Sequence, residues 1–273
     1  AASDADYGPN IKKLVDEKCN IIVGVGFLIN GAIVAAAKAN PTVHFAIVDQ
    51  DGEDHGADGS VYPGTKFANL KPLQFSTNES SFQAGYVAAG VSKTGKVAMI
   101  ANPNQADLFK DGFSAGVFAS KKKVIPIVKY VSGSYSVATT QVLDAGADVV
   151  FATTFGSDAE IFKSILARNA KKKGSVLGLI NIEPDQYITV TNATKKFLIA
   201  SVVKRVDKAI YDIIALSAAK KQYLDILDSE AGIYGRRYGI TGGGIEFTIR
   251  SKELLALSAS INVAAATAEK IPA

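Results

Sequence analysis

The sequence predicts an α/β protein in which helices cover both faces of parallel sheets. Short β-branched runs alternate with Ala-rich segments of helical pattern along most of the chain, which is typical of right-handed β-α-β crossovers. The 273 residues suit two domains, because one domain commonly takes about 100–150 residues. Hydrophobic residues make up 48% and charged residues 21%, so the chain has ample material for two globular cores.

The first half of the chain alternates between the two kinds of element. Strands are assigned to apolar, mostly β-branched runs bounded by Gly, Pro or Asn, and helices to Ala-rich or small-residue runs. The first helix ends at Pro41, whose ring prevents its continuation. The expected order is strand 20–25, helix 30–40, strand 43–48, polar loop 49–64, strand 73–75, helix 80–92 and strand 97–101.

The second half repeats this alternation. One expected helix ends in the lysine run 171–173, and lysines in a last turn complement the carbonyl end of the helix dipole. The expected order is helix 105–119, strand 124–130, helix 136–145, strand 149–153, helix 159–170, strand 175–180, strand 197–203, helix 205–220 and a terminal helix 254–270.

So many strands exceed one open sheet, and we therefore divide the chain into two doubly wound lobes joined by a hinge. The Asn-Pro-Asn sequence after residue 101 ends a strand without starting a helix, which marks a first crossing there. A second crossing is expected near Lys204. The division gives lobe 1 residues 1–102 and 205–238, and lobe 2 residues 103–204 and 239–273. Open α/β sheets bind ligands beyond the carboxyl ends of their strands, so two facing lobes predict a ligand cleft, as in the type I periplasmic-binding-protein fold.

Catalytic and metal sites lack their usual residues in this sequence. His44 and His55 are the only histidines, and neither has the partner spacing of a metal site or a catalytic triad. No Gly-x-Ser-x-Gly elbow is present, so no catalytic residue, metal or cofactor is predicted. Cys19 is the only cysteine and is interpreted as a small buried hydrophobe. No run reaches the roughly 18 apolar residues of a membrane span, and no signal peptide is visible.

Charged clusters are interpreted as solvated surface. The net charge is +4, and the lysine runs 121–123 and 171–173 carry no interleaved aromatics, which disfavours nucleic-acid binding. The acidic segment 49–54 places its glycine too early for a calcium loop and has Ser60 where a glutamate is needed. A solvated loop is therefore preferred to a calcium site.

Candidate ligand contacts lie where strands end. Gly26 and Phe27 form a tight strand-to-helix turn. Ile29 stands at the position of the third glycine in the Gly-x-Gly-x-x-Gly pattern of dinucleotide-binding proteins, which disfavours a pyrophosphate-binding loop. Phe27 either faces the cleft or packs in the core. Phe155 also follows a strand, and it either stacks on a nucleobase, worth about 1–3 kcal/mol, or packs in the core.

Two further candidates are polar. The segment 178–187 ends a strand with Glu183 and Asp185, and carboxylates there can accept hydrogen bonds from sugar hydroxyls. Lys204 stands at the expected crossing between the lobes. From its sequence context alone, it is equally consistent with a surface residue and with a donor to a ligand.

The segment 80–100 resembles the "SF-x-AG-x-x-A-x-x-x-SK-x-GKVG" signature of the basic membrane protein family, the solute-binding receptors of bacterial ABC importers. The likeness extends over nearly the whole chain. Its further motifs are "Dy-x-x-n-i" at 6–11, "vGF" at 25–27, "P-x-x-x-Fa-i-vD" at 41–49, "F-x-x-GF-x-aG" at 109–116, "GaDvvf" at 146–151, "DQY" at 185–187 and "SvvK-x-vd-x-ai" at 201–210. Each motif is weak alone, but their order and spacing are specific.

The resemblance implies an extracytoplasmic receptor that holds a nucleoside, in the first instance a purine nucleoside, and delivers it to an ABC permease. In such receptors aromatics stack on the base, while an acid and a lysine bind the ribose. Those roles fall on Phe155, Glu183 and Lys204, with Asp107 as a further cleft candidate. The family also implies a lipid anchor outside this sequence, a monomer, no cofactor, no nucleic-acid partner and no enzymatic activity.

The sequence departs from the family pattern at two places. Glu183 replaces the usual Asp and Asn181 replaces a Gly, so the sugar geometry is expected to differ. Family members also open with a strand and a "G-x-x-D-x-SFN" segment, and nothing similar precedes Ala1, so an N-terminal βα unit is expected to be missing from the sequence. Two alternative functions are the ligand-sensing domain of a regulator with the same fold and, less favoured, an enzyme acting on nucleosides.

Overall fold

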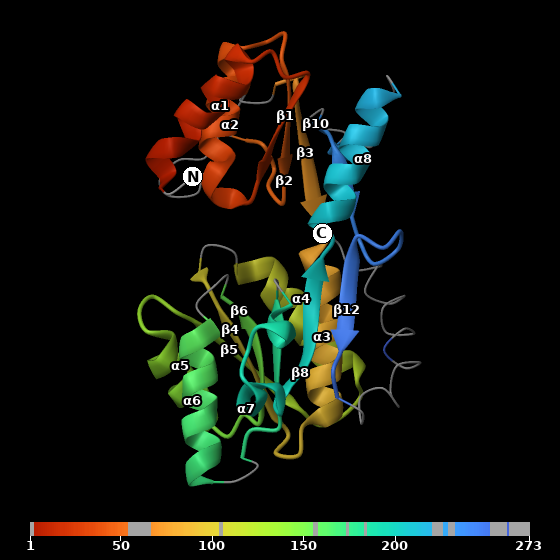
Figure 1. Ribbon diagram of the computed structural model, residues 1–273. Coiled ribbons are helices and arrows are strands. Elements are labelled where there is room, and N and C mark those ends of the chain that lie inside the picture. The colour runs from red at the N-terminus through yellow and green to blue at the C-terminus, as the bar shows by residue number, and fades with distance from the viewer. Residues whose placement is uncertain are drawn as a thin grey trace. The chain divides into compact units, whose positions relative to one another are not determined.

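The computed structural model describes residues 3–53, 67–103, 106–154, 158–172, 175–182, 185–219, 226–228, 233–251 and 261. The chain forms two compact units, each built from segments that are distant in the sequence (Figure 1). Unit 1 comprises Ala1–Phe75 and Arg205–Tyr238, and unit 2 comprises Ser76–Lys204 and Gly239–Ala273.

The first crossing between the units lies earlier than the sequence-based division places it. The structure puts it between Phe75 and Ser76, not after residue 102. Strand β4 (Lys96–Ala101) pairs in parallel with β5 (Ile125–Tyr130) on one side and with β6 (Val149–Thr153) on the other. The strand therefore belongs to unit 2. The Asn-Pro signal marks the end of β4 but carries no information about the sheet that β4 joins.

Unit 1 contains a four-stranded parallel sheet in the order β1-β2-β3-β11. Its core includes Ile22, Ile33, Phe45 and Ile47, all at most 2% exposed. The strands are β1 (Ile21–Val25), β2 (His44–Val48), β3 (Leu70–Phe75) and β11 (Arg236–Tyr238), and the helices are α1 (Tyr7–Asp16), α2 (Asn30–Ala39) and α8 (Val206–Ala218). Its short elements are η1 (Asp4–Asp6), η2 (Phe27–Ile29), and the antiparallel pair β9 (Ile226–Asp228) and β10 (Ile233–Tyr234).

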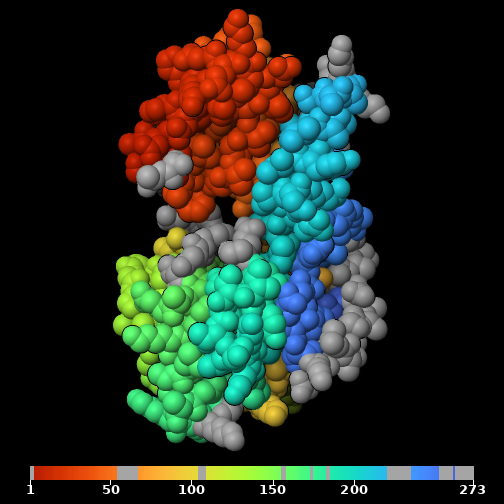
Figure 2. Space-filling model, viewed as in Figure 1, coloured from red at the N-terminus to blue at the C-terminus, as the bar shows by residue number. Residues whose placement is uncertain are grey.

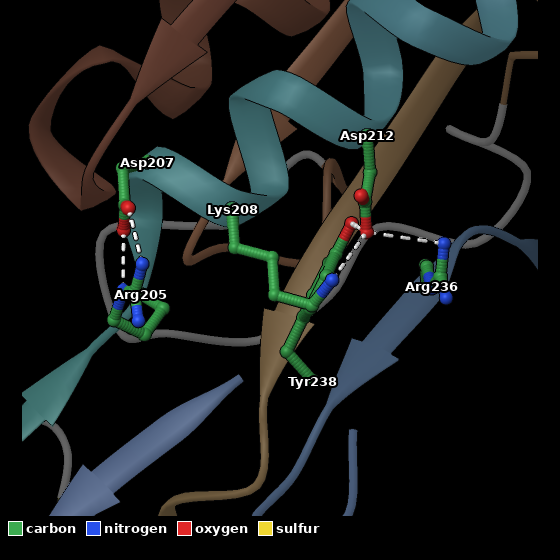
Figure 3. A network of polar contacts seen from close by, with 6 residues as sticks. All are labelled: Arg205, Asp207, Lys208, Asp212, Arg236 and Tyr238. Carbon is green, nitrogen blue, oxygen red and sulfur yellow. Dashed lines mark hydrogen bonds and ion pairs between the residues drawn. The ribbon is translucent and has the colours of Figure 1, made fainter. Parts of the chain in front are cut away.

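A polar network ties α8 to β11 within unit 1 (Figure 3). The Asp212 carboxylate on α8 receives Arg236 Nη1 at 3.2 Å and Lys208 Nζ at 3.5 Å. The Tyr238 hydroxyl donates to the same carboxylate at 3.3 Å, and the Tyr238 ring lies 5.5 Å from that of Phe75, its register partner on β3. These contacts hold the late strand β11 against the earlier part of the unit.

Unit 2 contains a six-stranded sheet in the order β12-β8-β7-β6-β4-β5, in which only the pairing of β12 with β8 is antiparallel. The remaining strands are β7 (Gly178–Ile182), β8 (Leu198–Lys204) and β12 (Ile245–Ile249). The helices are α3 (Thr77–Val91), α4 (Ala106–Ala119), α5 (Tyr135–Asp144), α6 (Asp158–Lys171) and α7 (Asn192–Lys195), with the short η4 (Gln186–Ile188). Figure 2 shows α6 in green, the α7–β8 region in turquoise and β12 in blue side by side on one face of this unit.

Helices cover both faces of the unit 2 sheet. Val150 and Ala152 of β6 pack in a cluster with Ile161 and Ile165 of α6. Phe151 lies between them in the sequence, and its ring stacks on Phe113 of α4 at 5.7 Å. Because neighbouring residues of a strand point to opposite faces, α6 and α4 lie on opposite sides of the sheet. This is the doubly wound arrangement expected from the sequence.

Helices α3 and α4 approach each other so closely that glycines are required between them. A Cβ atom built on Gly85 would stand 2.0 Å from the Phe113 carbonyl oxygen, and one on Gly116 would stand 2.0 Å from the Phe82 carbonyl oxygen. Both glycines belong to the motifs that carry the family resemblance. Their role in the fold is to let the two backbones touch.

A buried carboxylate joins two other signature motifs. Asp148, just before β6, is 2% exposed. It accepts hydrogen bonds from Ser92 Oγ at 2.7 Å, from the Lys93 amide at 2.7 Å and from the Thr94 amide at 2.8 Å. The "SK-x-GKV" and "GaD" motifs therefore fix the loop that leads from α3 into β4.

Candidate functional site

The carboxyl edge of the unit 2 sheet is the first candidate site. The parallel strands β4, β6, β7 and β8 end together there, because their registers align the strand ends. Ligands of open α/β sheets bind at this edge. The sequence candidate Phe155 lies two residues after β6 and Glu183 directly follows β7, but both lie outside the described residues. Their contact with a ligand stays a prediction.

Lys204 is the last residue of β8, at this same edge. Its neighbour on β12 is Ile245, and only 6% of Lys204 is exposed. A lysine so deeply buried at a strand end is not an ordinary surface residue. Asp107 is the second residue of α4, and its side chain lies outside the described part.

Asp158 joins two of the segments at this edge. It is the first residue of α6 and is 2% exposed. The hydroxyl of Thr154, just after β6, donates to one carboxylate oxygen, and the side-chain amide of Gln186, beyond β7, donates to the other. Burial raises the pKa of the Asp158 carboxyl above its ordinary range, and the two hydrogen bonds oppose this shift. Asp158 thus clamps the segments that flank the positions of Phe155 and Glu183.

Asp185 is engaged inside unit 2. Its Oδ1 accepts from Ser201 Oγ at 3.0 Å and from the Tyr187 amide at 3.2 Å, and its Oδ2 accepts from Arg250, which follows β12. The Arg250 guanidinium also lies 4.9 Å from the centre of the Tyr187 ring. These contacts make Asp185 a support of the segment after β7. The predicted contact of Asp185 with a ligand is untested.

Only partial signals for this cluster exist in the sequence. Gln186 is recognisable there as part of a family motif, but its contact with Asp158 spans 28 positions. Arg250 carries no local signal that separates it from other surface arginines. The spacing of four between Thr154 and Asp158 is the one local indication of a contact.

The carboxyl edge of the unit 1 sheet is the second candidate. Gly26 follows β1 with φ of +88°, a conformation that favours glycine, and this explains the "vGF" turn. Phe27 is 44% exposed, so it does not pack in the core of unit 1. The adjacent Asn30 is buried, and its Nδ2 donates to the Glu53 carbonyl at 2.7 Å. Contact of Gly26 or Phe27 with a ligand stays a prediction.

Metal-ligand clusters and membrane-spanning helices are both absent from the described residues. No three His, Cys, Asp or Glu side chains gather there in a way that could hold a metal ion. Over the same residues, none of the helices combines the length and the hydropathy needed to cross a membrane.

Replacing Asp158 with Asn tests the cost of the buried charge. The pKa of the Asp158 carboxyl is raised in the folded protein. Its contribution to the free energy of unfolding is therefore fully present below the unfolded-state pKa of about 3.9 and is lost as the pH rises through the folded-state pKa. We expect the stability of Asp158→Asn, relative to that of the unsubstituted protein, to be greater at about pH 8 than at about pH 4. Urea unfolding at both pH values measures this difference, with the exposed Asp144→Asn as control. A variant that becomes relatively less stable toward the higher pH contradicts the assignment.

Comparison with curated proteins finds relatives over most of the chain. The CD4+ T-cell-stimulating antigen of Listeria innocua is 29% identical over 233 residues, which cover 80% of this chain and 61% of that protein. The ABC transporter nucleoside-binding protein BmpA of Lactococcus lactis is 29% identical over 226 residues, covering 77% of this chain and 60% of BmpA. The chain therefore spans about 60% of the length of these relatives.

Comparison with solved structures establishes the fold. A transcriptional activator of the comK gene from Bacillus halodurans matches 98% of this chain and 84% of its own, with a TM-score of 0.73 and 20% identity. An ABC transporter system solute-binding protein from Aeropyrum pernix matches 100% of this chain and 70% of its own, with a TM-score of 0.64 and 20% identity. The type I periplasmic-binding-protein fold expected from the sequence is confirmed.

The family model described as ABC transporter substrate-binding protein PnrA-like, Bmp, matches residues 1–271. The match takes in the glycine contacts of α3 and α4, the Asp148 junction and the strand end at Lys204. The chain belongs to the Bmp family of PnrA-like ABC transporter substrate-binding proteins.

Proposed function

We propose that this protein is the solute-binding component of an ABC importer and that it binds a nucleoside-like ligand without chemically changing it. Family membership is the observation that carries the proposal. The name of the Lactococcus lactis relative, a nucleoside-binding protein, supports the ligand class. The partners proposed with it are an ABC permease and, through a lipid anchor, the outer face of a cell membrane, with the protein itself monomeric.

The ligand is proposed to bind at the carboxyl edges of the sheets. Lys204 would donate to sugar hydroxyls, Glu183 would accept from them, and Phe155 or Phe27 would stack on the base. The clamps at Asp158 and Asp185 support this role, because they fix the segments on either side of the proposed contacts. The longer carboxylate of Glu183, compared with the family's Asp, is expected to shift the sugar within the site.

Isothermal titration calorimetry with inosine, guanosine, adenosine and uridine tests the ligand class. We expect at least one of them to bind with a dissociation constant in the micromolar range or below. Chromatography after prolonged incubation should show the nucleoside intact. If none of the four binds, the nucleoside assignment is wrong, and if free base accumulates, the protein is an enzyme.

Removing the Lys204 ammonium should weaken binding. Hydrogen bonds to charged groups contribute about 1.5–3 kcal/mol, so we expect the dissociation constant to rise roughly 10- to 100-fold. Because Lys204 is buried, Lys204→Met, which keeps the apolar stem, should be compared with Lys204→Ala. Lys163→Met, on the exposed side of α6, is the matched control. Unchanged affinity in both Lys204 variants would remove this residue from the site.

A regulator's ligand-sensing domain is the second candidate function. One observation favours it, namely the likeness to the Bacillus halodurans protein named as a transcriptional activator. Sequencing the gene upstream of the codon for Ala1 separates the two proposals. A helix-turn-helix segment there would support the regulator, whereas a signal peptide with a lipobox cysteine would support the receptor.

A further inference from the structure

Lysines gather at the amino edge of the unit 2 sheet, opposite the candidate ligand edge. Four strands start close together at this edge. Lys96 of β4 pairs with Ile125 of β5, Leu179 of β7 pairs with Leu198 of β8, and β6 lies between β4 and β7. Each of these four strands is preceded by lysines, and β4 also begins with one. The set is Lys93, Lys96, Lys121, Lys122, Lys123, Lys171, Lys172, Lys195 and Lys196, of which Lys96 and Lys195 are half-buried and the others exposed.

This amino edge combines segments that are distant in the sequence. The edge spans five parallel strands, which at about 4.8 Å between neighbours makes it roughly 20 Å wide. Figure 1 shows α6 ending at this edge of unit 2, at the bottom of the view. In the sequence these lysine runs look like separate solvated ends of elements. The sheet brings them together into one surface.

The positive charge of the amino edge is not neutralised within the described residues. Asp148 is buried and accepts hydrogen bonds from neutral groups of the loop between α3 and β4, so its carboxylate offsets the charge of one lysine at most, and Asp144 pairs with Arg168. The ammonium groups of Lys96 and Lys122 donate to the carbonyls of Ala145 and Gly90, at 2.8 and 2.7 Å. Carbonyl partners fix these side chains but leave their charge in place.

Two large apolar side chains flank the lysine run 121–123. Phe118, in the last turn of α4, is 67% exposed, and Ile125, the first residue of β5, is 60% exposed. The Lys121 amide donates to the Phe118 carbonyl at 3.1 Å, so the turn holds the phenylalanine beside the lysines. Neither a soluble anion nor a nucleic-acid backbone needs an exposed isoleucine. Basic residues with neighbouring apolar side chains are typical of surfaces that bind membrane interfaces.

We propose that the amino edge of the unit 2 sheet docks on an anionic phospholipid bilayer. The lysines attract the lipid phosphates, and Phe118 and Ile125 enter the boundary between headgroups and acyl chains. Each lysine near an anionic surface strengthens binding about fivefold, and the attraction weakens as salt is added. This surface is independent of the ligand site, so it stands even if the nucleoside assignment fails.

Co-sedimentation of the 273-residue chain with vesicles tests the charge contribution. We expect binding in about 50 mM salt to vesicles with about 30% phosphatidylglycerol, at least roughly tenfold weaker binding to pure phosphatidylcholine, and release in about 500 mM salt.

A variant with four amino-edge lysines changed to Gln should bind at least about tenfold more weakly. The four positions are Lys93, Lys123, Lys172 and Lys196. The matched control changes four exposed unit 1 lysines to Gln and should stay within about twofold of the unsubstituted protein. Its positions are Lys12, Lys13, Lys18 and Lys38.

A fluorescence experiment tests the apolar contribution separately. The chain contains no tryptophan, so Phe118→Trp places a single reporter at the amino edge. Its emission should shift to shorter wavelength when anionic vesicles are added, whereas Tyr211→Trp, at a position 72% exposed on α8, should not shift. The proposal is overturned by an unshifted emission from the Phe118→Trp variant, by equal loss in both four-lysine variants, or by binding to duplex DNA without binding to vesicles.

Discussion

Changing Gly85 to Ala is expected to destabilise unit 2 by about 3 kcal/mol or more, at the upper end for overpacking. The new Cβ would stand 2.0 Å from the Phe113 carbonyl oxygen. Because that oxygen belongs to the backbone, no side-chain movement relieves the clash. Helices α3 and α4 must instead separate, and both lose packing against the sheet. Gly116→Ala should act similarly, since it meets the Phe82 carbonyl at 2.0 Å.

Urea unfolding followed by circular dichroism measures this effect. Gly31→Ala in α2 is the matched control, because a Cβ there meets no atom within 4 Å. As a helical glycine replaced by alanine, it should stabilise the protein by about 0.5–1 kcal/mol. Gly133→Ala in unit 2, also without neighbours, should be nearly neutral. Similar midpoints for Gly85→Ala and Gly133→Ala would show that the two helices separate without cost.

Changing Asp148 to Ala should cost about 3–5 kcal/mol, because it removes a buried carboxylate that accepts three part-buried hydrogen bonds, and hydrogen bonds to charged groups contribute about 1.5–3 kcal/mol each. The amides of Lys93 and Thr94 and the Ser92 hydroxyl all lie within 2.8 Å of the carboxylate. The loop into β4 would lose its only described carboxylate acceptor. Asp148→Asn, which keeps one oxygen acceptor, should have an intermediate stability.

Hydrogen exchange gives a readout specific to this junction. The amides of Lys93 and Thr94 should exchange much faster in Asp148→Ala, at conditions where the rest of unit 2 stays protected. Asp144→Ala removes a carboxylate that is 64% exposed and paired with Arg168, and it should change stability by less than about 1 kcal/mol. If both variants are equally stable, the Asp148 hydrogen bonds contribute little.

The order of most strands and helices was predictable from the sequence, because burial on both faces makes parallel strands continuously apolar. The strands β11 and β12 were missed. Tyr238 is the one apolar residue of the three in β11, and β12 alternates polar and apolar residues after a glycine-rich turn. Such segments become strands because they pair with a strand that is distant in the sequence, and their local residue pattern does not specify that pairing. The predicted helix 254–270 lies outside the described residues apart from helical Ile261.

The motifs that carried the family resemblance have a structural function where the structure describes them. Gly85 and Gly116 allow two helices to touch, and Asp148 holds a loop. The position of Lys204 at a strand end was predictable, because the apolar run stops there. The Asp158 clamp was not, since Gln186 reaches it from another strand's loop. The ligand contacts expected of the aromatic and the acid after β6 and β7 remain predictions.

The interleaved composition of the two units has a consequence for synthesis on the ribosome. The first segment of unit 1 is Ala1–Phe75, but its strand β11 comes only at Arg236–Tyr238, whereas the five parallel strands that the structure describes in unit 2 have been made by Lys204. At about 5–20 residues per second, the segment Arg205–Tyr238 takes roughly 2–7 s to translate. Unit 2 can therefore begin to fold before β11, the partner of β3, has been made. The synthesis of unit 1 starts first, but its sheet is completed last.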